Sequence, residues 1–148
     1  MLGLSRKTML ALEAVVDIAY NARPGPVQSK DITARQGVPH RYLEQALQHL
    51  VRHGVLKGVR GPRGGYRLAR ERRRISVGQV VRLLADLDQP DLPEEGAEIG
   101  RMVLQPMLQE ITDQAMRELD AISIEDLCQR ARREGIAHRG GRGADFEI

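Results

Sequence analysis

Apolar side chains recur every three or four positions over most of this chain of 148 residues, which is the spacing of amphipathic helices. The first such segment places Met9, Leu12 and Val16 on one face and charged residues on the others. Similar patterns follow along the chain. Together they predict helices over residues 5–21, 29–36, 39–54, 76–85, 99–122 and 124–133.

Residues that start or end helices stand at several of these boundaries. Gly37 ends the second predicted helix, and Pro39 suits the first turn of the third, where its missing N–H is no loss. Ser29 is positioned to cap the second helix, and Ser76 forms a capping box with Gln79 ahead of the fourth. The second and third helices are short and meet at a glycine turn, so they predict a helix-turn-helix.

The helical pattern is interrupted between residues 55 and 68. Alternating apolar residues there predict two short strands, the first with Val55 and Val59 and the second with Tyr66 and Leu68. Glycines in the turn permit backbone angles that other residues avoid. The turn reads Arg60-Gly61-Pro62-Arg63-Gly64-Gly65. We therefore expect a mainly α fold with a small β-hairpin wing, which is a winged helix-turn-helix.

The composition changes after the fourth predicted helix. Residues 86–98 contain six carboxylates and two prolines with few large apolar residues, so they predict an exposed acidic loop. Four parts are expected: a winged helix-turn-helix DNA-binding domain over 1–85, the acidic loop over 86–98, a dimerisation helix with a short C-terminal helix over 99–133, and a flexible tail over 134–148.

The long helix predicted over residues 99–122 has an apolar stripe that is wide for a surface helix. A lone appended helix cannot bury such a stripe. It could pack on its own domain or cross the same helix of a second subunit. A homodimer is favoured, because a two-fold arrangement also suits paired DNA half-sites. Pro106 should kink this helix or mark its start.

Charge is distributed unevenly along the chain, although the formal net charge is only +3. Residues 35–74 hold 11 Lys or Arg and 2 Asp or Glu, whereas residues 86–128 hold 2 Lys or Arg and 12 Asp or Glu. A localised basic surface attracts polyanions, which favours double-stranded DNA as the partner of the first half. Two ordinary solvated surfaces are the alternative.

Enzymes and membrane proteins are disfavoured classes. The chain contains no Gly-x-Ser-x-Gly elbow, no His-Glu-x-x-His pair, no P-loop and no paired-cysteine motif, so no catalytic residues are predicted. Its apolar runs are far shorter than the roughly 20 residues of a membrane helix. With one cysteine the chain forms no internal disulfide, which favours the cytoplasm.

The opening turns of the third predicted helix are expected to read DNA bases, because that part of a recognition helix reaches the major groove. Arg41 can donate to guanine, Gln45 can pair with adenine and Glu44 can accept from cytosine, while Tyr42 suits a phosphate. An ordinary polar helix face is the alternative. Ser29, at the start of the preceding helix, is included among the predicted DNA contacts.

The hairpin turn supplies the other predicted DNA contacts. An arginine at a wing can enter a narrow minor groove, although contacts to phosphates are the commoner task. These residues are Arg60, Gly61, Arg63, Gly64 and Gly65.

Two further features of the sequence are candidate sensing sites. His49 and His53 are four residues apart, a spacing that can place two imidazoles on one metal, but two ligands make a weak site and no metal is predicted. Cys128 could be a thiol switch. Its helical spacing from Ile124 and its place beside Leu127 favour packing instead.

These motifs together resemble the family of bacterial winged-helix transcription regulators that includes IscR, NsrR and CymR. The resemblance spans residues 1–133. It implies a homodimeric regulator, a repressor, whose long helices cross and whose two recognition helices enter successive major grooves. The strongest matches are Tyr42-Leu43-Glu44-Gln45, Val59-Arg60-Gly61-Pro62, Gly64-Gly65-Tyr66 and residues 75–81.

The chain departs from the family in one segment. Many members hold an iron–sulfur cluster on three cysteines and a further ligand, but the corresponding residues 87–105 contain no Cys and no His. Alignment with the family puts Met102 and Gln105 about where its last cysteine and its histidine stand. Thioether and amide are not adequate substitutes for thiolate and imidazole. The resemblance therefore implies a member without cofactor, similar to CymR.

Two other functions stay open from the sequence. A protein-interaction regulator would bind an enzyme or another regulator through the acidic C-terminal half, and an architectural protein would bind DNA without sequence preference. An effector molecule or a partner enzyme is also compatible with a DNA-binding dimer. Substitution of Arg41 or Arg60 separates these functions, since only a sequence reader loses specificity.

Overall fold

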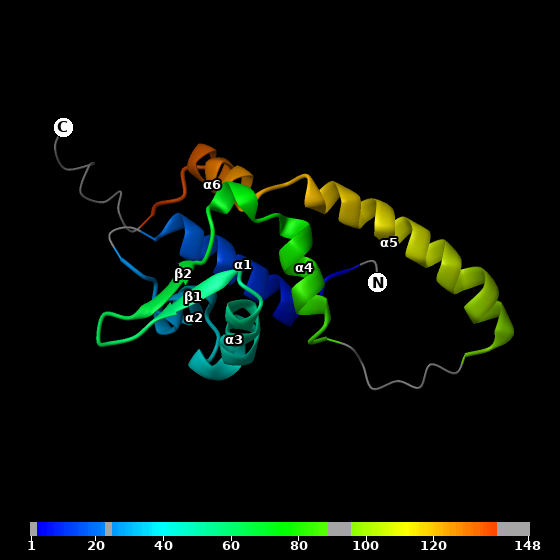
Figure 1. The fold of residues 1–148 in the computed structure, drawn as a ribbon, viewed down its shortest axis with the longest axis horizontal. Helices are drawn as coiled ribbons and strands as arrows, with labels where there is room; N and C mark the ends of the chain where they lie inside the picture. The colour runs from blue at the N-terminus through cyan, green and yellow to red at the C-terminus, as the bar shows by residue number, and fades with distance from the viewer. Residues whose placement is uncertain (1–2, 23–24, 89–95, 139–148) are drawn as a thin grey trace.

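The computed structural model describes residues 3–22, 25–88 and 96–138 (Figure 1). Its elements, in chain order, are α1 (Arg6–Tyr20), α2 (Ser29–Gln36), the 3₁₀ helix η1 (His40–Leu43), α3 (Glu44–Arg52), β1 (Leu56–Val59), β2 (Gly65–Leu68), the 3₁₀ helix η2 (Arg72–Arg74), α4 (Val77–Ala85), the π-helical segment η3 (Gly100–Leu104), α5 (Gln105–Asp120) and α6 (Ile124–Arg133). The expected fold class, mainly α with one hairpin, is confirmed.

Helix α1 is the centre of the molecule. It contacts α2, α4, α6 and β2, and its inward face is fully buried through residues such as Ala14, Val15 and Ile18. Burial of an aliphatic side chain of the size of Val or Ile stabilises the fold by roughly 1.5–3 kcal/mol. Ser5 caps the helix, because its Oγ accepts a hydrogen bond from the backbone N–H of Thr8 at 3.0 Å.

The helix-turn-helix is formed by α2, η1 and α3. Gly37 ends α2 in the left-handed conformation, with φ at 70°, which only glycine adopts without a steric cost. Ile32 and Leu47, one from each α-helix, are fully buried and fix the two helices against α1. Pro39 precedes the 3₁₀ turn η1, so the third predicted helix opens as 3₁₀ and becomes α-helical only at Glu44.

Strands β1 and β2 form an antiparallel hairpin with Leu56 opposite Leu68 and Val59 opposite Gly65. Val27 adds a short third edge, since its N–H and C=O exchange hydrogen bonds of 3.0 and 2.8 Å with Tyr66. The segment before α2 is thereby attached to the hairpin. The hairpin extends from the body of the protein at the left of Figure 1.

Helices α4 and α6 start beside each other. Ser76 and Ser123 form an isolated antiparallel bridge, flanked by a 2.8 Å hydrogen bond from Val77 N–H to Ile122 C=O and a 2.9 Å bond from Ile124 N–H to Ile75 C=O. This junction fixes where α5 ends against the winged domain. From there α5 extends away from the body, as Figure 1 shows, and none of its residues is buried.

Several predicted boundaries are corrected by the structure. The cap at Ser29 is wrong, because Gln28 is the N-cap residue, without a side-chain hydrogen bond, and Ser29 is the first residue of α2. The pairing of Val27 with Tyr66 fixes the backbone just before α2, so the helix begins one residue earlier than a Ser29 cap would place it. Of the capping box at Ser76, the structure has the Ser76 half, a 3.0 Å bond from Gln79 N–H. A complete box joins Ser123 and Asp126 instead.

The predicted long helix is divided into two parts. A π-helical segment precedes α5, and Pro106 lies in the first turn of α5, so proline marks the start of the regular helix as expected. Of the predicted acidic loop and tail, residues 89–95 and 139–148 lie outside the described residues. No helix among residues 3–22, 25–88 and 96–138 is long and apolar enough to cross a membrane.

Candidate nucleic-acid interface

The recognition helix has one buried and one exposed side. Leu43, Ala46, Leu47 and Leu50 are buried against α1 and α4, which orients the rest of η1 and α3 outward. All four predicted base-reading residues lie on that outward side and are exposed. They are Arg41, Tyr42, Glu44 and Gln45.

The exposed side is largely free of internal ion pairs. Within the described residues, the one salt bridge on η1 and α3 joins His40 Nε2 to Glu44 Oε1 at 3.8 Å. Arg41 and Gln45 make no side-chain hydrogen bond to any described residue, so their donors are available to a ligand. Such unpaired donors on a fixed helix can bind base edges or phosphates.

The hairpin turn carries Arg60 and Arg63, both exposed. Its shape is fixed from inside by a 2.9 Å hydrogen bond from Gly64 N–H to Gly61 C=O, and from outside by a 3.3 Å bond from Gln28 Nε2 to Pro62 C=O. Gln28 directly precedes α2, so one side chain links the turn to the helix-turn-helix. Nothing in the sequence around Gln28 indicates this role, because a contact 34 residues along the chain leaves no local pattern.

The three glycines of the turn differ in their environments. Gly61 has φ at 110° and open space around it, whereas Gly64 is buried and Gly65 is half-buried. A Cβ atom at Gly64 would lie 2.2 Å from the Val59 carbonyl oxygen, and one at Gly65 would lie 2.4 Å from that of Val27. Gly64 and Gly65 are therefore required for close backbone approach. Their contact with DNA stays a prediction.

Tyr66 connects the hairpin to the recognition helix. Its side chain is half-buried, and burial together with the carboxylate of Glu44 raises the pKa of the Tyr66 phenol. The hydroxyl therefore remains a hydrogen-bond donor at neutral pH. Gln48 and Arg52 of α3 line one surface hollow with Gly58 and Tyr66 of the hairpin, so the predicted recognition helix and the hairpin form one continuous surface.

Ser29 stands at the start of α2, where the first backbone N–H groups of a helix have no partner within the helix. Such N–H groups suit a phosphate. The Ser29 carbonyl accepts a 3.0 Å hydrogen bond from Thr33 Oγ1, and Ser29 is half-buried. This position suits a phosphate contact, and the contact of Ser29 with DNA stays a prediction.

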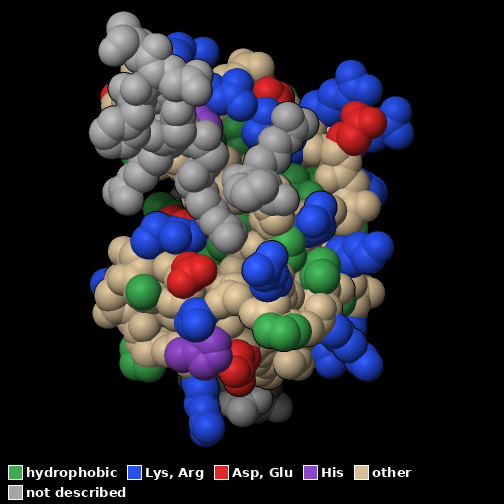
Figure 2. All heavy atoms as spheres, turned by 90° about the vertical axis from the view of Figure 1, so that its left-hand side faces the viewer, with side chains coloured by type: hydrophobic (Ala, Val, Ile, Leu, Met, Phe, Trp, Pro, Cys, Tyr) green, Lys and Arg blue, Asp and Glu red, His purple; other side chains and the backbone are tan. Residues whose placement is uncertain are grey.

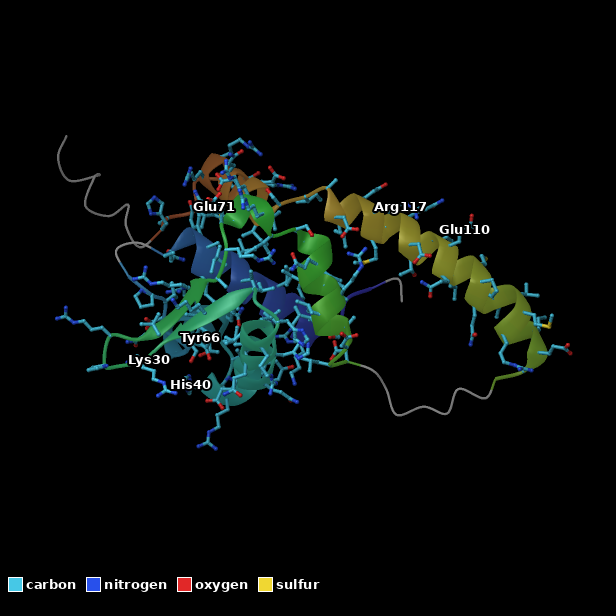
Figure 3. The ribbon with its side chains drawn as sticks, in the orientation of Figure 1. Lys30, His40, Tyr66, Glu71, Glu110 and Arg117 are labelled. Carbon is cyan, nitrogen blue, oxygen red and sulfur yellow. The ribbon has the colours of Figure 1, made fainter. Side chains whose placement is uncertain are left out.

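The face that contains the hairpin is rich in cations. Figure 2 shows Lys and Arg side chains spread widely over this face, with fewer Asp and Glu between them. Lys30 on α2 and His40 on η1 extend from the same part of the molecule in Figure 3, while Glu110 and Arg117 lie on the distant α5. The basic surface and the exposed reading residues thus belong to the same half of the protein.

The two predicted sensing features have different environments. The rings of His49 and His53 are 4.4 Å apart and tilted, and the buried Nε2 of His49 has no hydrogen-bond partner. In the described ranges no third metal-ligating side chain joins this pair. Cys128 is fully buried on α6, and burial raises the pKa of its thiol, which makes the thiolate scarcer.

The sequence is similar to known transcription regulators. The model of the Rrf2 family, described as an iron-dependent transcriptional regulator, matches residues 4–130. The HTH-type transcriptional regulator IscR of Xenorhabdus nematophila is 32% identical over 139 residues, which are 92% of this chain and 85% of the relative. IscR of Escherichia coli O1:K1 is 42% identical over 78 residues, which are 53% of this chain and 48% of that relative.

Solved structures agree with the sequence comparison. T. potens IscR has a TM-score of 0.72 and 33% identity, over 92% of this chain and 93% of that one. CymR, the global cysteine regulator of B. subtilis, has a TM-score of 0.67 and 28% identity, over 88% of this chain and 98% of that one. These relatives are regulators rather than enzymes, and they do not favour a pure protein-interaction function. With its winged helix and its match over residues 4–130, the chain belongs to the Rrf2 family of DNA-binding transcription regulators.

Proposed function

We propose that this protein is a cytoplasmic, homodimeric repressor that binds promoter DNA by sequence and works without an iron–sulfur cluster. The observation that carries the proposal is the single surface formed by α3 and the hairpin. Arg41 and Gln45 on one side, with Arg60 and Arg63 on the other, are all exposed on elements that are fixed by buried contacts.

The helix and the hairpin would contact different parts of the DNA. A recognition helix enters the major groove, where Arg41 would donate to guanine O6 and N7 and Gln45 would pair with adenine. Arg60 and Arg63 at the hairpin turn would contact the adjacent minor groove or its phosphates. Tyr42, which is 39% exposed, would donate to a phosphate, and Glu44 would accept from cytosine.

The test of sequence reading is selection of bound duplexes from a random DNA pool, with the native protein and the Arg41→Ala and Arg60→Ala variants. We expect a two-fold-symmetric site. Arg41→Ala should lose about 1–3 kcal/mol of discrimination at one base pair of each half-site. Arg117→Ala, an exposed change on α5, is the matched control and should select the same site as the native protein.

Two results would contradict sequence-specific binding. Selection without enrichment, with binding that weakens equally on all sequences as salt increases, would identify an architectural DNA binder. No binding to any duplex would leave the acidic half as the functional surface. Repression itself is tested on a promoter that contains the selected site, where added protein should lower the amount of transcript.

Homodimer formation is supported by the uncovered apolar side of η3 and α5. Met102 is 68% exposed, Val103 is 59% exposed and Met107 is 47% exposed. Large apolar side chains that adjoin one another and face water are characteristic of interaction surfaces. A second copy of the same helix would cover them and place two α3 helices on one side of the dimer.

The residues present do not fit an iron–sulfur cluster. Such clusters are held mainly by cysteine thiolates, and this chain has one cysteine, Cys128, which is fully buried on α6. Met102 and Gln105, at the positions that correspond to family ligands, offer a thioether and an amide. Even two subunits together would supply two cysteines.

We expect protein prepared without oxygen to be colourless and to contain no iron. The measurement is the visible absorption spectrum with iron and sulfide analysis of the same sample. Stoichiometric iron and sulfide together with visible absorption would show that ligands outside the expected set hold a cluster.

A further inference from the structure

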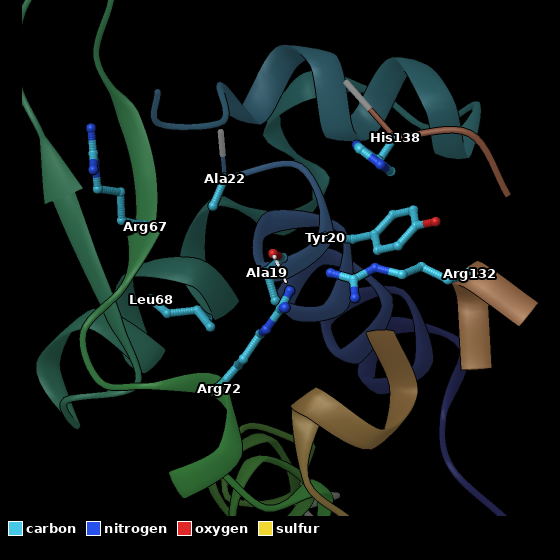
Figure 4. A pocket seen from close by; sticks show the side chains of 8 residues that line it. All are labelled: Ala19, Tyr20, Ala22, Arg67, Leu68, Arg72, Arg132 and His138. Atoms are coloured by element: carbon cyan, nitrogen blue, oxygen red, sulfur yellow. Dashed lines mark hydrogen bonds between the residues drawn. The ribbon is translucent and has the colours of Figure 1, made fainter. Parts of the chain in front are cut away.

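A hollow of about 550 Å³ lies at the C-terminal end of α1 (Figure 4). Its walls come from α1, from β2 through Arg67 and Leu68, from η2 through Arg72, from α6 through Arg132, and from the segment after α6 through His138. The volume is within the range of about 300–1,000 Å³ that is typical of small-molecule sites. In Figure 1, α6 lies above α1 and α3 lies below it, so this hollow is not part of the recognition surface.

The described lining of the hollow is cationic. It includes three arginines and no Asp or Glu. Figure 4 shows the guanidinium groups of Arg72 and Arg132 pointing into the same space beside Tyr20. Because like charges that converge repel one another, an anion between them would be strongly attracted.

Of the three arginines in the lining, Arg72 has a carboxylate partner among the described residues. Arg72 forms a salt bridge with Glu125 and donates to the Ala19 carbonyl at 3.5 Å, near the end of α1, where a cation is favourable. Arg67 and Arg132 pair with no carboxylate among the described residues. Arg132 is therefore the unpaired guanidinium in the hollow, whereas that of Arg67 points away from Tyr20 and Arg132 in Figure 4.

The rest of the lining is apolar and well fixed. The Tyr20 hydroxyl donates to the Ile136 carbonyl, and the Tyr20 ring meets the His138 ring edge-on, with centroids 5.3 Å apart and an interplanar angle of 80°. Leu68 contributes an aliphatic side chain. A fixed aromatic wall beside the unpaired guanidinium group of Arg132 suits a ligand with a flat or apolar body and an anionic group.

We propose that this hollow binds a small organic anion that carries a carboxylate or phosphate group on an apolar or aromatic body. Arg132, beside Arg72, would bind the anionic group, and the Tyr20 ring would pack against the body. The site is independent of the proposed DNA reading, because it uses none of the residues assigned to base contacts. Its ligand would touch both the hairpin strand β2 and helix α6.

The experiment is calorimetric titration of the full chain, without DNA, with adenosine 5′-monophosphate and with citrate as probes. Adenosine is the neutral control for the first probe. We expect saturable binding of adenosine 5′-monophosphate and at least about tenfold weaker binding of adenosine. Arg132→Gln should weaken binding of the anion about tenfold, whereas Arg133→Gln, the adjacent exposed arginine outside the lining, should change it less than about twofold.

Three outcomes would overturn the proposal. The first is the absence of saturable binding for both probes, and the second is equal weakening by Arg132→Gln and Arg133→Gln. The third is displacement of the bound probe by a short DNA duplex in native protein but not in Arg132→Gln, which would assign Arg132 to a DNA surface. Arg72→Gln, on a different element, gives a second and independent loss if the site is as described, and circular dichroism verifies that each variant is folded.

Discussion

At the scale of single residues, the hairpin turn requires glycine at Gly64 and Gly65, because a Cβ atom at either position would clash with a backbone carbonyl oxygen. Gly65 lies so close to the Val27 carbonyl that a Cβ atom would be 2.4 Å from the oxygen, and its φ of 155° is unfavourable for other residues. Val27 and Tyr66 pair at this point. The glycine thus permits the contact that attaches the hairpin to the segment before α2.

Gly65→Ala is therefore expected to destabilise the fold by about 2 kcal/mol or more, because a backbone oxygen cannot move aside cheaply. Gly58→Ala is the matched control: it lies in β1 with nothing within 4 Å of the added carbon, and it should change stability by less than about 0.5 kcal/mol. Urea denaturation followed by circular dichroism measures both. Equal stability of the two variants would contradict the close approach at Val27.

At the scale of elements, charged side chains from distant parts of the chain form hydrogen bonds with both ends of α1. The first turn of α1 has no acidic residue and its last turn has no basic one. Asp88 accepts hydrogen bonds from Ser5 and Thr8 at the first end, and Arg72 donates to Ala19 at the second. The negative Asp88 lies at the N-terminal end of the helix and the positive Arg72 at its C-terminal end, and both placements are favourable to the helix dipole, so each stabilises α1.

The sequence predicted the elements well and their contacts poorly. Helical spacing located α1, α2, α4 and α6 within about two residues, because a local pattern of buried positions determines them. The Asp88 contact and the arginines around the hollow join residues more than 50 positions apart. No local pattern marks such pairs, since each member appears in the sequence as an ordinary charged surface residue.

The exposure of the proposed DNA-reading residues was predictable for a related reason. Arg41 and Gln45 belong to the opening turns of the predicted recognition helix and Arg60 and Arg63 to the hairpin turn, and the structure exposes all four. What sequence could not show was the 3₁₀ opening at η1 or the Gln28 side chain that holds the turn. Both depend on where the hairpin meets the helix-turn-helix.

Asp88 offers a test of the α1 contact through pH. Hydrogen bonds from Ser5 and Thr8 lower the pKa of the Asp88 carboxyl, so the folded protein favours the ionised form. That stabilisation is present at neutral pH and is lost as the pH falls through the lowered pKa, below about 4. Asp88→Asn should thus lower the Tm by about 2–5 °C at pH 7, and the deficit should shrink in acid.

Glu110→Gln removes one carboxylate from exposed α5 and is the control for net charge. Thermal unfolding of native protein and both variants between pH 3 and pH 7 distinguishes the effects. A deficit in Asp88→Asn that stays constant over this range, or that Glu110→Gln reproduces, would show that the carboxylate of Asp88 does not stabilise α1.

At the scale of the whole molecule, α5 projects from a well-packed body without covering for its own apolar residues. Its contacts with the winged domain are concentrated near α4, where Arg82 binds Asp120 through two hydrogen bonds. Within residues 3–22, 25–88 and 96–138, the opposite end of the projection, from Ile99 to Met107, contacts no residue of the buried core. A monomer would expose this apolar surface permanently, which is the physical reason to expect a second copy.

Met107→Glu should weaken self-association about tenfold or more, because a carboxylate would be transferred from water into an apolar contact. Gln105→Glu introduces the same charge two positions earlier, nearly opposite on the helix, and should leave association within about twofold of native. Sedimentation velocity over a range of protein concentrations measures both variants. A native protein that sediments as a monomer at every concentration would refute the dimer, whereas equal weakening by the two variants would place the contact elsewhere.

If Met107→Glu is monomeric, the length of the selected DNA site should fall to one half-site, since each winged domain would then bind alone.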